Sequence, residues 1–255
     1  MIKILHLIDN LGRGGVELWL LSMLQAIPRD VCAMNFCCKG EHLGQLAPLA
    51  QEQGAKFHHC PLGVNHIPFF RCLRNVCAEG NYQIIHNHLH VYSGMPVWMA
   101  RKNGIPIITS FHNTSSPPEH SFTRLPAIRQ LRHLYGIMSV NYALKHSDVV
   151  TALSQGVLNA IDPARKKITG DTHVLYYGTA LTEITSPEKR ASLRESLGWN
   201  ASTFLLIHVG RFSEQKNHPG LIDIFRRVLA GVPEARLLLI GDGILRPSVE
   251  QMVAN

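Results

Sequence analysis

Short apolar runs alternate with stretches of helical periodicity along the whole chain. Runs such as FLLIHV (204–209) and ARLLLI (235–240) are apolar throughout, which is typical of strands covered on both faces of a parallel sheet. Strands that alternate with helices imply right-handed crossover connections and helices on both sides of the sheet. The pattern therefore predicts an α/β fold.

The predicted elements can be assigned from these runs. The predicted strands are 2–8, 33–37, 56–61, 84–88, 105–110, 149–152, 173–177, 204–209 and 235–240. The predicted helices include 16–25, 43–53, 69–79, 94–102, 125–146, 188–197, 219–230 and 245–253. A polar stretch at 179–187 (TALTEITSP) separates the first series of strands from the second.

This boundary predicts two Rossmann-like domains, 1–178 and 179–255. The second series offers two strong strands, fewer than the roughly six of a doubly wound sheet. The chain also ends at VEQMVAN, within a helical pattern and without a capping signal. We therefore expect the second domain to be incomplete and the chain to be a fragment or a truncated gene product.

The composition favours anionic partners, because the chain has 25 Lys and Arg residues against 18 Asp and Glu residues and a net charge of +7. Nucleic acid, acidic lipid and phosphorylated substrates all fit this balance. The N-terminal segment lacks signal-peptide features, and no apolar run approaches the ~18 residues of a spanning helix, so we expect a cytoplasmic protein, soluble or peripheral. The six cysteines lie mostly among apolar neighbours, which favours reduced core thiols over a disulfide framework.

The segment LGRGGVE (11–17) is the first candidate phosphate site. It follows the first predicted strand, and Gly14 and Gly15 would let the backbone approach a ligand closely at the N-terminus of the next helix. The alternative interpretation is a tight turn.

The segment HVGRFSEQKNHPG (208–220) is the second candidate. Gly210 and Arg211 stand at the carboxyl end of a predicted strand, where open α/β sheets bind ligands, and Lys216 precedes a helix that begins near Asn217. An arginine fork, a lysine charge and a helix N-terminus together match a diphosphate. The alternative is a solvated basic loop.

These segments resemble the signatures of glycosyltransferase family 4, whose members have the two-domain GT-B fold. GRF and QKNH resemble the motif around the diphosphate-binding arginine and lysine of that family, and GGVE resembles its N-terminal glycine loop. DVVTALS (148–154) and LLLIGDG resemble further family strands, so the resemblance extends over the whole chain. The nearest members are transferases that build exopolysaccharide or capsular polysaccharide.

The resemblance implies transfer of a sugar from a nucleotide diphosphate sugar to a glycan or lipid-linked acceptor. Retention at the anomeric carbon, no metal, no other cofactor and no nucleic-acid partner are implied with it. Arg211 and Lys216 would neutralise the departing diphosphate, helped by Gly210 in the same loop. Gly14 and Gly15 would contact the donor phosphates.

His112, in the segment TSFHN, matches the histidine that the family places beside the donor sugar. The alternative is a cleft-lining or core histidine. Glu17 stands at the glutamate position of the glycine loop, where we expect a structural role in the first helical turn. The catalytic residues implied are thus His112, Arg211 and Lys216.

Two departures from the family matter. YYGTAL (176–181) replaces the usual Asn-Gly turn, and the two family glutamates that hold the donor ribose and sugar would lie beyond Asn255. We therefore expect these 255 residues alone not to bind a donor usefully. A non-catalytic binding protein or decayed gene product is the alternative function. A nucleotide-binding epimerase is disfavoured, because the chain lacks a dinucleotide fingerprint and a suitable Tyr-x-x-x-Lys pair.

Two further patterns leave alternatives open. His86, His88 and His90 alternate, so a strand would aim all three the same way, but we expect no metal there because the family often carries a histidine at this sheet edge. The basic stretch 124–146, which includes the predicted helix 125–146, intersperses cations with Leu, Ile, Tyr and Met; its basic residues are Arg124, Arg129, Arg132, His133, Lys145 and His146. It fits peripheral contact with an anionic membrane as well as a solvated surface helix.

Overall fold

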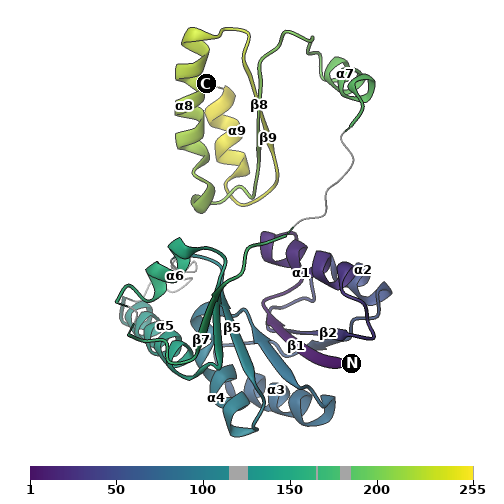
Figure 1. The fold of residues 1–255 in the computed structure, drawn as a ribbon. Coiled ribbons are helices and arrows are strands. Elements are labelled where there is room, and N and C mark those ends of the chain that lie inside the picture. Colours follow the sequence, from purple (N-terminus) through teal and green to yellow (C-terminus); the bar gives the residue numbers. More distant parts are fainter. Residues whose placement is uncertain (115–125, 165, 179–184, 255) are drawn as a thin grey trace. The chain divides into compact units, whose positions relative to one another are not determined.

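In a computed structural model, the chain forms two compact units, Met1–Ala180 and Leu181–Asn255. The structure describes residues 1–114, 126–164, 166–178 and 185–254, apart from the side chains of 126–129. Each unit contains a parallel sheet with helices packed on it, as Figure 1 shows. The expected α/β class is confirmed.

The first unit is built on a seven-stranded sheet in the order β3-β2-β1-β4-β5-β6-β7, in which every pair of neighbours is parallel. Its strands are β1 (Ile2–Ile8), β2 (Cys32–Cys38), β3 (Phe57–His59), β4 (Ile84–Asn87), β5 (Ile107–Phe111), β6 (Val149–Ala152) and β7 (Asp171–Val174). The order changes direction between β1 and β4. In open α/β sheets, ligands bind at the carboxyl ends of the strands beside such a switch point.

Helices cover both faces of this sheet (Figure 1). They are α1 (Gly15–Ala26), α2 (Ala47–Glu52), α3 (Ile67–Gly80), η1 (His90–Tyr92), α4 (Gly94–Lys102), α5 (Pro126–His146) and α6 (Gln155–Ile161). Leu5 and Leu7 of β1 belong to the core layer of α3 and α4. Ile8 belongs to the layer of α1 and α2, and His6, which alternates with the two leucines, contacts Phe36 of this second layer.

In the first unit one helix was missed and one strand prediction was wrong. The helix α6 was not predicted; it is short, and its signal is the N-cap Ser154, whose hydroxyl oxygen accepts the Val157 N–H at 3.2 Å. The strand β4 ends at Asn87, and His90 begins the 3-10 helix η1 with φ +47°. His86, His88 and His90 therefore do not share one strand face, because the chain turns after the second of them.

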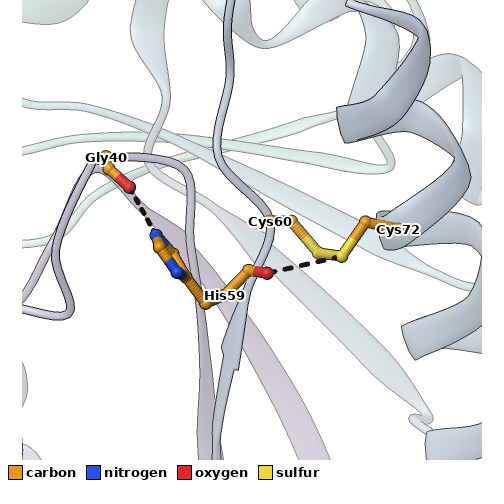
Figure 2. Close-up of a disulfide and its surroundings, with 4 residues drawn as sticks. All are labelled: Gly40, His59, Cys60 and Cys72. Carbon is orange, nitrogen blue, oxygen red and sulfur yellow. Dashed lines mark hydrogen bonds between the residues drawn. A yellow bond between two sulfur atoms is a disulfide. The ribbon is translucent and has the colours of Figure 1, made fainter.

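The expectation of reduced cysteines was wrong for one pair. Cys60 and Cys72 form a disulfide, with Cα atoms 5.6 Å apart, whereas Cys32, Cys37, Cys38 and Cys77 are free. Figure 2 shows Cys60 directly after β3 and Cys72 on α3. The His59 Nε2–H donates to the Gly40 carbonyl oxygen at 2.8 Å, so the strand end beside Cys60 is also tied to the β2 side. The pairing depends on this packing of β3 against α3, which the cysteine spacing does not reveal.

The second unit contains α7 (Pro187–Ser196), β8 (Leu205–Val209), η2 (Glu214–Lys216), α8 (His218–Gly231), β9 (Arg236–Ile240) and α9 (Arg246–Ala254). Its parallel sheet has two strands within the described residues, β8 and β9. A small core forms around Phe212, Ile222 and Val249. The strand residues Ile207 and Val209 remain 58% and 70% exposed, so the described part of this unit leaves apolar strand surface uncovered.

Candidate functional site

The glycine loop lies at the carboxyl end of β1, beside the switch point of the sheet. Gly14 is the N-cap of α1 and has an extended backbone. A Cβ atom at Gly14 would overlap the Glu17 carboxylate, which folds back over this position. A carboxylate in the first turn interacts favourably with the helix dipole, so Glu17 has the structural environment expected of it. The Glu17 side chain therefore covers part of the backbone surface that Gly14 would offer to a ligand.

A row of side chains joined by hydrogen bonds crosses the same edge of the sheet. The Tyr177 hydroxyl bonds to His112 Nδ1. His112 Nε2 lies 2.9 Å from His88 Nδ1, and His88 Nε2 lies 3.2 Å from His6 Nδ1. His6 comes from β1, His88 follows β4 and His112 follows β5, so three strand ends supply this row.

The histidines of this row are neutral at ordinary pH. Burial lowers the pKa of His6 to about 3 and that of His112 to about 4, where nearby His90 adds to the effect. Burial, with repulsion from His86, His112 and His6, also holds the pKa of His88 well below its usual range. Each ring therefore has one N–H donor and one bare acceptor nitrogen.

Aromatic rings and hydroxyl groups enclose the row. Trp19 of α1 stacks on Tyr177 with ring centroids 4.8 Å apart. The His86 ring packs on the His88 ring with centroids 4.1 Å apart. The Nε2 atom of His86 lies 2.6 Å from the Ser110 hydroxyl oxygen, which is hydrogen-bonded to the Thr151 hydroxyl at 2.5 Å. Neighbouring side chains thus contact the rings of the row on several sides.

The structure thus places His112 at the end of β5, as the sequence implied, but with both ring nitrogens occupied. A substrate hydroxyl can bond to this ring only by displacing Tyr177 or His88. Tyr177, His6 and Trp19 were not among the predicted site residues. His6 could have been noticed as a polar residue inside the apolar run of β1. Tyr177 could have been noticed because YYGTAL departs from the Asn-Gly turn of the family.

The same cluster contains the residues with metal-binding geometry. His6, His86 and His88 offer ligand atoms that all lie within 4.8 Å of one another. Neutral imidazoles are ligands for zinc and related ions. His6 takes the place that the sequence pattern assigned to His90. Two of these side chains, His6 and His88, are already hydrogen-bonded to each other.

The second unit positions the basic loop at the carboxyl end of β8. Gly210 follows this strand, and a Cβ atom at Gly210 would contact the aliphatic stem of Lys216, so the two residues lie against each other. Arg211 and Lys216 are exposed, and no described carboxylate forms an ion pair with either. Asn217 caps α8, accepting the Gly220 N–H at 3.3 Å. Two cations and a helix N-terminus thus converge on one loop.

The loop after β9 supports this basic loop through backbone contacts. The Gly210 N–H donates to the Ile240 carbonyl oxygen and the Phe212 N–H to that of Asp242, each at 2.9 Å. A Cβ atom at Gly241 would overlap the Gly210 carbonyl oxygen, so only glycine fits there. His218, fully buried, stacks on Phe212 at 4.2 Å. The conformation around Arg211 is therefore set by packing on both sides.

Comparison with known proteins agrees with the resemblance in the sequence. The profile of Glycosyltransferase Family 4 matches residues 13–182. The putative glycosyltransferase EpsF of Bacillus subtilis (strain 168) is 23% identical over 98% of this chain and 64% of its own length. The capsular polysaccharide biosynthesis glycosyltransferase CapH of Staphylococcus aureus is 20% identical over 88% of this chain and 57% of its own.

A solved structure shows the same fold. Anabaena Alr3699/HepE, crystallised with UDP and glucose, superposes with a TM-score of 0.75 at 22% identity, over all of this chain and 66% of that one. The match identifies the fold as the two-domain GT-B type. The chain spans about two thirds of the length of EpsF and HepE.

Proposed function

Because this chain belongs to glycosyltransferase family 4, we propose that the whole protein transfers a sugar from a nucleotide diphosphate sugar to a glycan or lipid-linked acceptor. The single observation that carries the proposal is the loop of Arg211 and Lys216 at the N-terminus of α8, where two unpaired cations face solvent within the described residues. Such a loop matches the charge of a diphosphate.

The proposed chemistry follows from this charge. As the bond from the anomeric carbon to the phosphate oxygen breaks, negative charge collects on the leaving diphosphate. The acceptor hydroxyl oxygen forms the new bond to the same carbon, and its proton passes to the leaving diphosphate. Arg211, Lys216 and the dipole of α8 stabilise this charge, so no metal is required. We propose retention of the anomeric configuration, Gly14 and Gly15 as further donor contacts, and His112 beside the donor sugar.

Titration calorimetry with a panel of nucleotide sugars tests this function. We expect the whole protein to bind one donor with a dissociation constant in the micromolar range and to transfer the sugar to a glycan or lipid-linked acceptor, with UDP-sugars as the first compounds to try. Product anomers resolved by NMR would report retention or inversion. Binding without any transfer would instead support a non-catalytic binding protein, and binding of none of the panel would contradict the proposal.

We also propose that α5 contacts an anionic membrane. The helix has no acidic residue, and its exposed side includes Leu131, Leu134, Ile137 and Met138, which are 46% to 72% exposed, with Arg132 beside them. Arg124 of the predicted basic stretch lies outside the described residues. Apolar side chains and cations on one helix surface suit the interface of an acidic bilayer. Among the described residues, no helix is long and apolar enough to cross a membrane.

Replacing Leu134 and Met138 together by Glu should weaken binding to phosphatidylglycerol-containing vesicles about tenfold, because apolar burial is lost and negative charge is added. Flotation with vesicles of phosphatidylcholine, with and without phosphatidylglycerol, measures this. Leu193→Glu, on the 62% exposed Leu193 of α7, is the matched control. If the double variant and Leu193→Glu bind the vesicles equally well, or if binding does not depend on phosphatidylglycerol, α5 is excluded as the membrane contact.

A further inference from the structure

The row Tyr177–His112–His88–His6 has a direction that its chemistry determines. A neutral imidazole donates through one nitrogen and accepts through the other. The three bonds of the row therefore all point the same way. Either the tyrosine donates at one end, or His6 donates at the other.

The inner end of the row does not decide between these directions. His6 is 1% exposed, and its Nε2 has no hydrogen-bond partner in the described part of the chain. If Tyr177 donates, this nitrogen carries an unpaired proton. If His6 donates through Nδ1, the same nitrogen has an unpaired lone pair. Both directions leave one buried polar atom unsatisfied.

The outer end of the row, at Tyr177, decides which direction the hydrogen bonds take. A phenol hydroxyl, with an ordinary pKa of about 10, is a stronger acid and a better donor than the N–H of a neutral imidazole. Burial, reinforced by the Glu17 carboxylate, raises the pKa of Tyr177, so the hydroxyl keeps its proton. The favoured bond is therefore O–H to nitrogen, from Tyr177 to His112 Nδ1.

We propose that Tyr177 is a positioning residue that fixes the tautomer of His112, with His88 and His6 following in the same tautomer. His112 then carries its proton on Nε2 and donates to His88 Nδ1, and His88 Nε2–H donates to His6 Nδ1. Trp19, stacked on the tyrosine ring, holds the hydroxyl in place. The tautomer assignment rests on the first unit alone; its importance for catalysis rests on the proposed function.

The substitution Tyr177→Phe removes the hydroxyl and keeps the ring on Trp19. Tyr176→Phe is the matched control, since Tyr176 is the neighbouring residue and is 71% exposed. Nitrogen-15 NMR of the imidazole rings reports the tautomers directly. In the unaltered protein we expect the Nε2–H form for His112, His88 and His6. In Tyr177→Phe we expect His112 to lose this single form and the other two rings to shift with it, while Tyr176→Phe changes none of them.

Three NMR results would overturn the proposal. One is a His112 protonated on Nδ1 in the unaltered protein, and another is a spectrum of Tyr177→Phe in which the three rings are unchanged. The third is a simultaneous shift of His6, His86 and His88 with one equivalent of Zn²⁺, reversed by EDTA. That result would assign the cluster to a metal ion in place of the hydrogen-bonded row.

Kinetics then separate positioning from mere support of the fold. In the active whole protein, Tyr177→Phe should lower kcat about tenfold with the donor KM within about twofold, at an unchanged melting temperature. A donor KM that rises while kcat holds would contradict a positioning role. If no sugar transfer is detected for the unaltered protein, the proposed function fails, whereas the NMR result still decides the tautomer.

Discussion

Alanine in place of Arg211 or Lys216 should lower the kcat of the whole protein about a hundredfold in each case, because charge on the leaving diphosphate would lose a partner that acts mainly in the transition state. Both side chains are exposed on a loop that β8, β9 and α8 hold in place, so their removal should leave the melting temperature of the protein nearly unchanged. Initial rates of donor consumption at saturating acceptor measure the effect.

Arg227→Ala and Lys189→Ala are the matched controls, since both residues are exposed cations of the same unit outside this loop. The kcat of Arg211→Lys should lie between that of Arg211→Ala and that of the unaltered protein, because lysine retains the charge but not the planar fork. Full activity in both Arg211→Ala and Lys216→Ala would remove the basic loop from the mechanism.

Acidification should destabilise the first unit strongly. His6, His86, His88 and His112 have folded-state pKa values lowered mainly by burial, whereas an unfolded histidine titrates near 6.5. Between about pH 6.5 and about pH 4 the unfolded state therefore binds more protons than the folded state, and the free energy of unfolding falls as the pH falls. Each group contributes up to about 1.4 kcal/mol per pH unit, so His6 and His112 together should cost about 2.5 kcal/mol at pH 5.5 relative to pH 7, and His86 and His88 should add to this loss.

Denaturant titrations at a series of pH values measure this slope. His112→Gln should reduce the slope of the unfolding free energy against pH by the contribution of one bound proton, since glutamine does not titrate in this range. Thr172→Gln, at an exposed position of β7, should leave the slope as it is, since neither side chain titrates in this range. A first unit whose free energy of unfolding is constant from pH 7 to pH 5 would show that these histidines are accessible to protons in the folded state.

Most strands of the first unit could be predicted because they are apolar runs with helical stretches between them, whereas β3 (FHH) and β7 (DTHV) are short and partly polar. FLLIHV and ARLLLI are likewise strands of the second sheet. Boundaries shifted where tertiary pairing decided them: β7 was expected at 173–177 but pairs with β6 over Asp171–Val174. The local pattern of apolar residues indicates which segments are buried, whereas the residues at which a strand begins and ends depend on its pairing with the neighbouring strand.

The candidate site was predictable only where one continuous segment carries it. The basic loop of the second unit contains its own arginine, lysine and helix cap, so its chemistry is visible in thirteen consecutive letters, HVGRFSEQKNHPG. The row of the first unit joins His6, His88, His112 and Tyr177, and its bonds span 82, 24 and 65 positions. Such a row depends on strand order, which a single sequence does not specify. The disulfide of Cys60 and Cys72 was missed for the same reason.

The close approach of Gly241 to Gly210 limits how this protein can be re-engineered. The two loops of the second unit meet backbone to backbone, with no side chain between them at that point. A chimaera that imports only the GRF segment from another member of the family would pair it with a GDG turn whose backbone fits the original loop. The exchangeable module is therefore the pair of loops together with both strands, β8 and β9, and their helices.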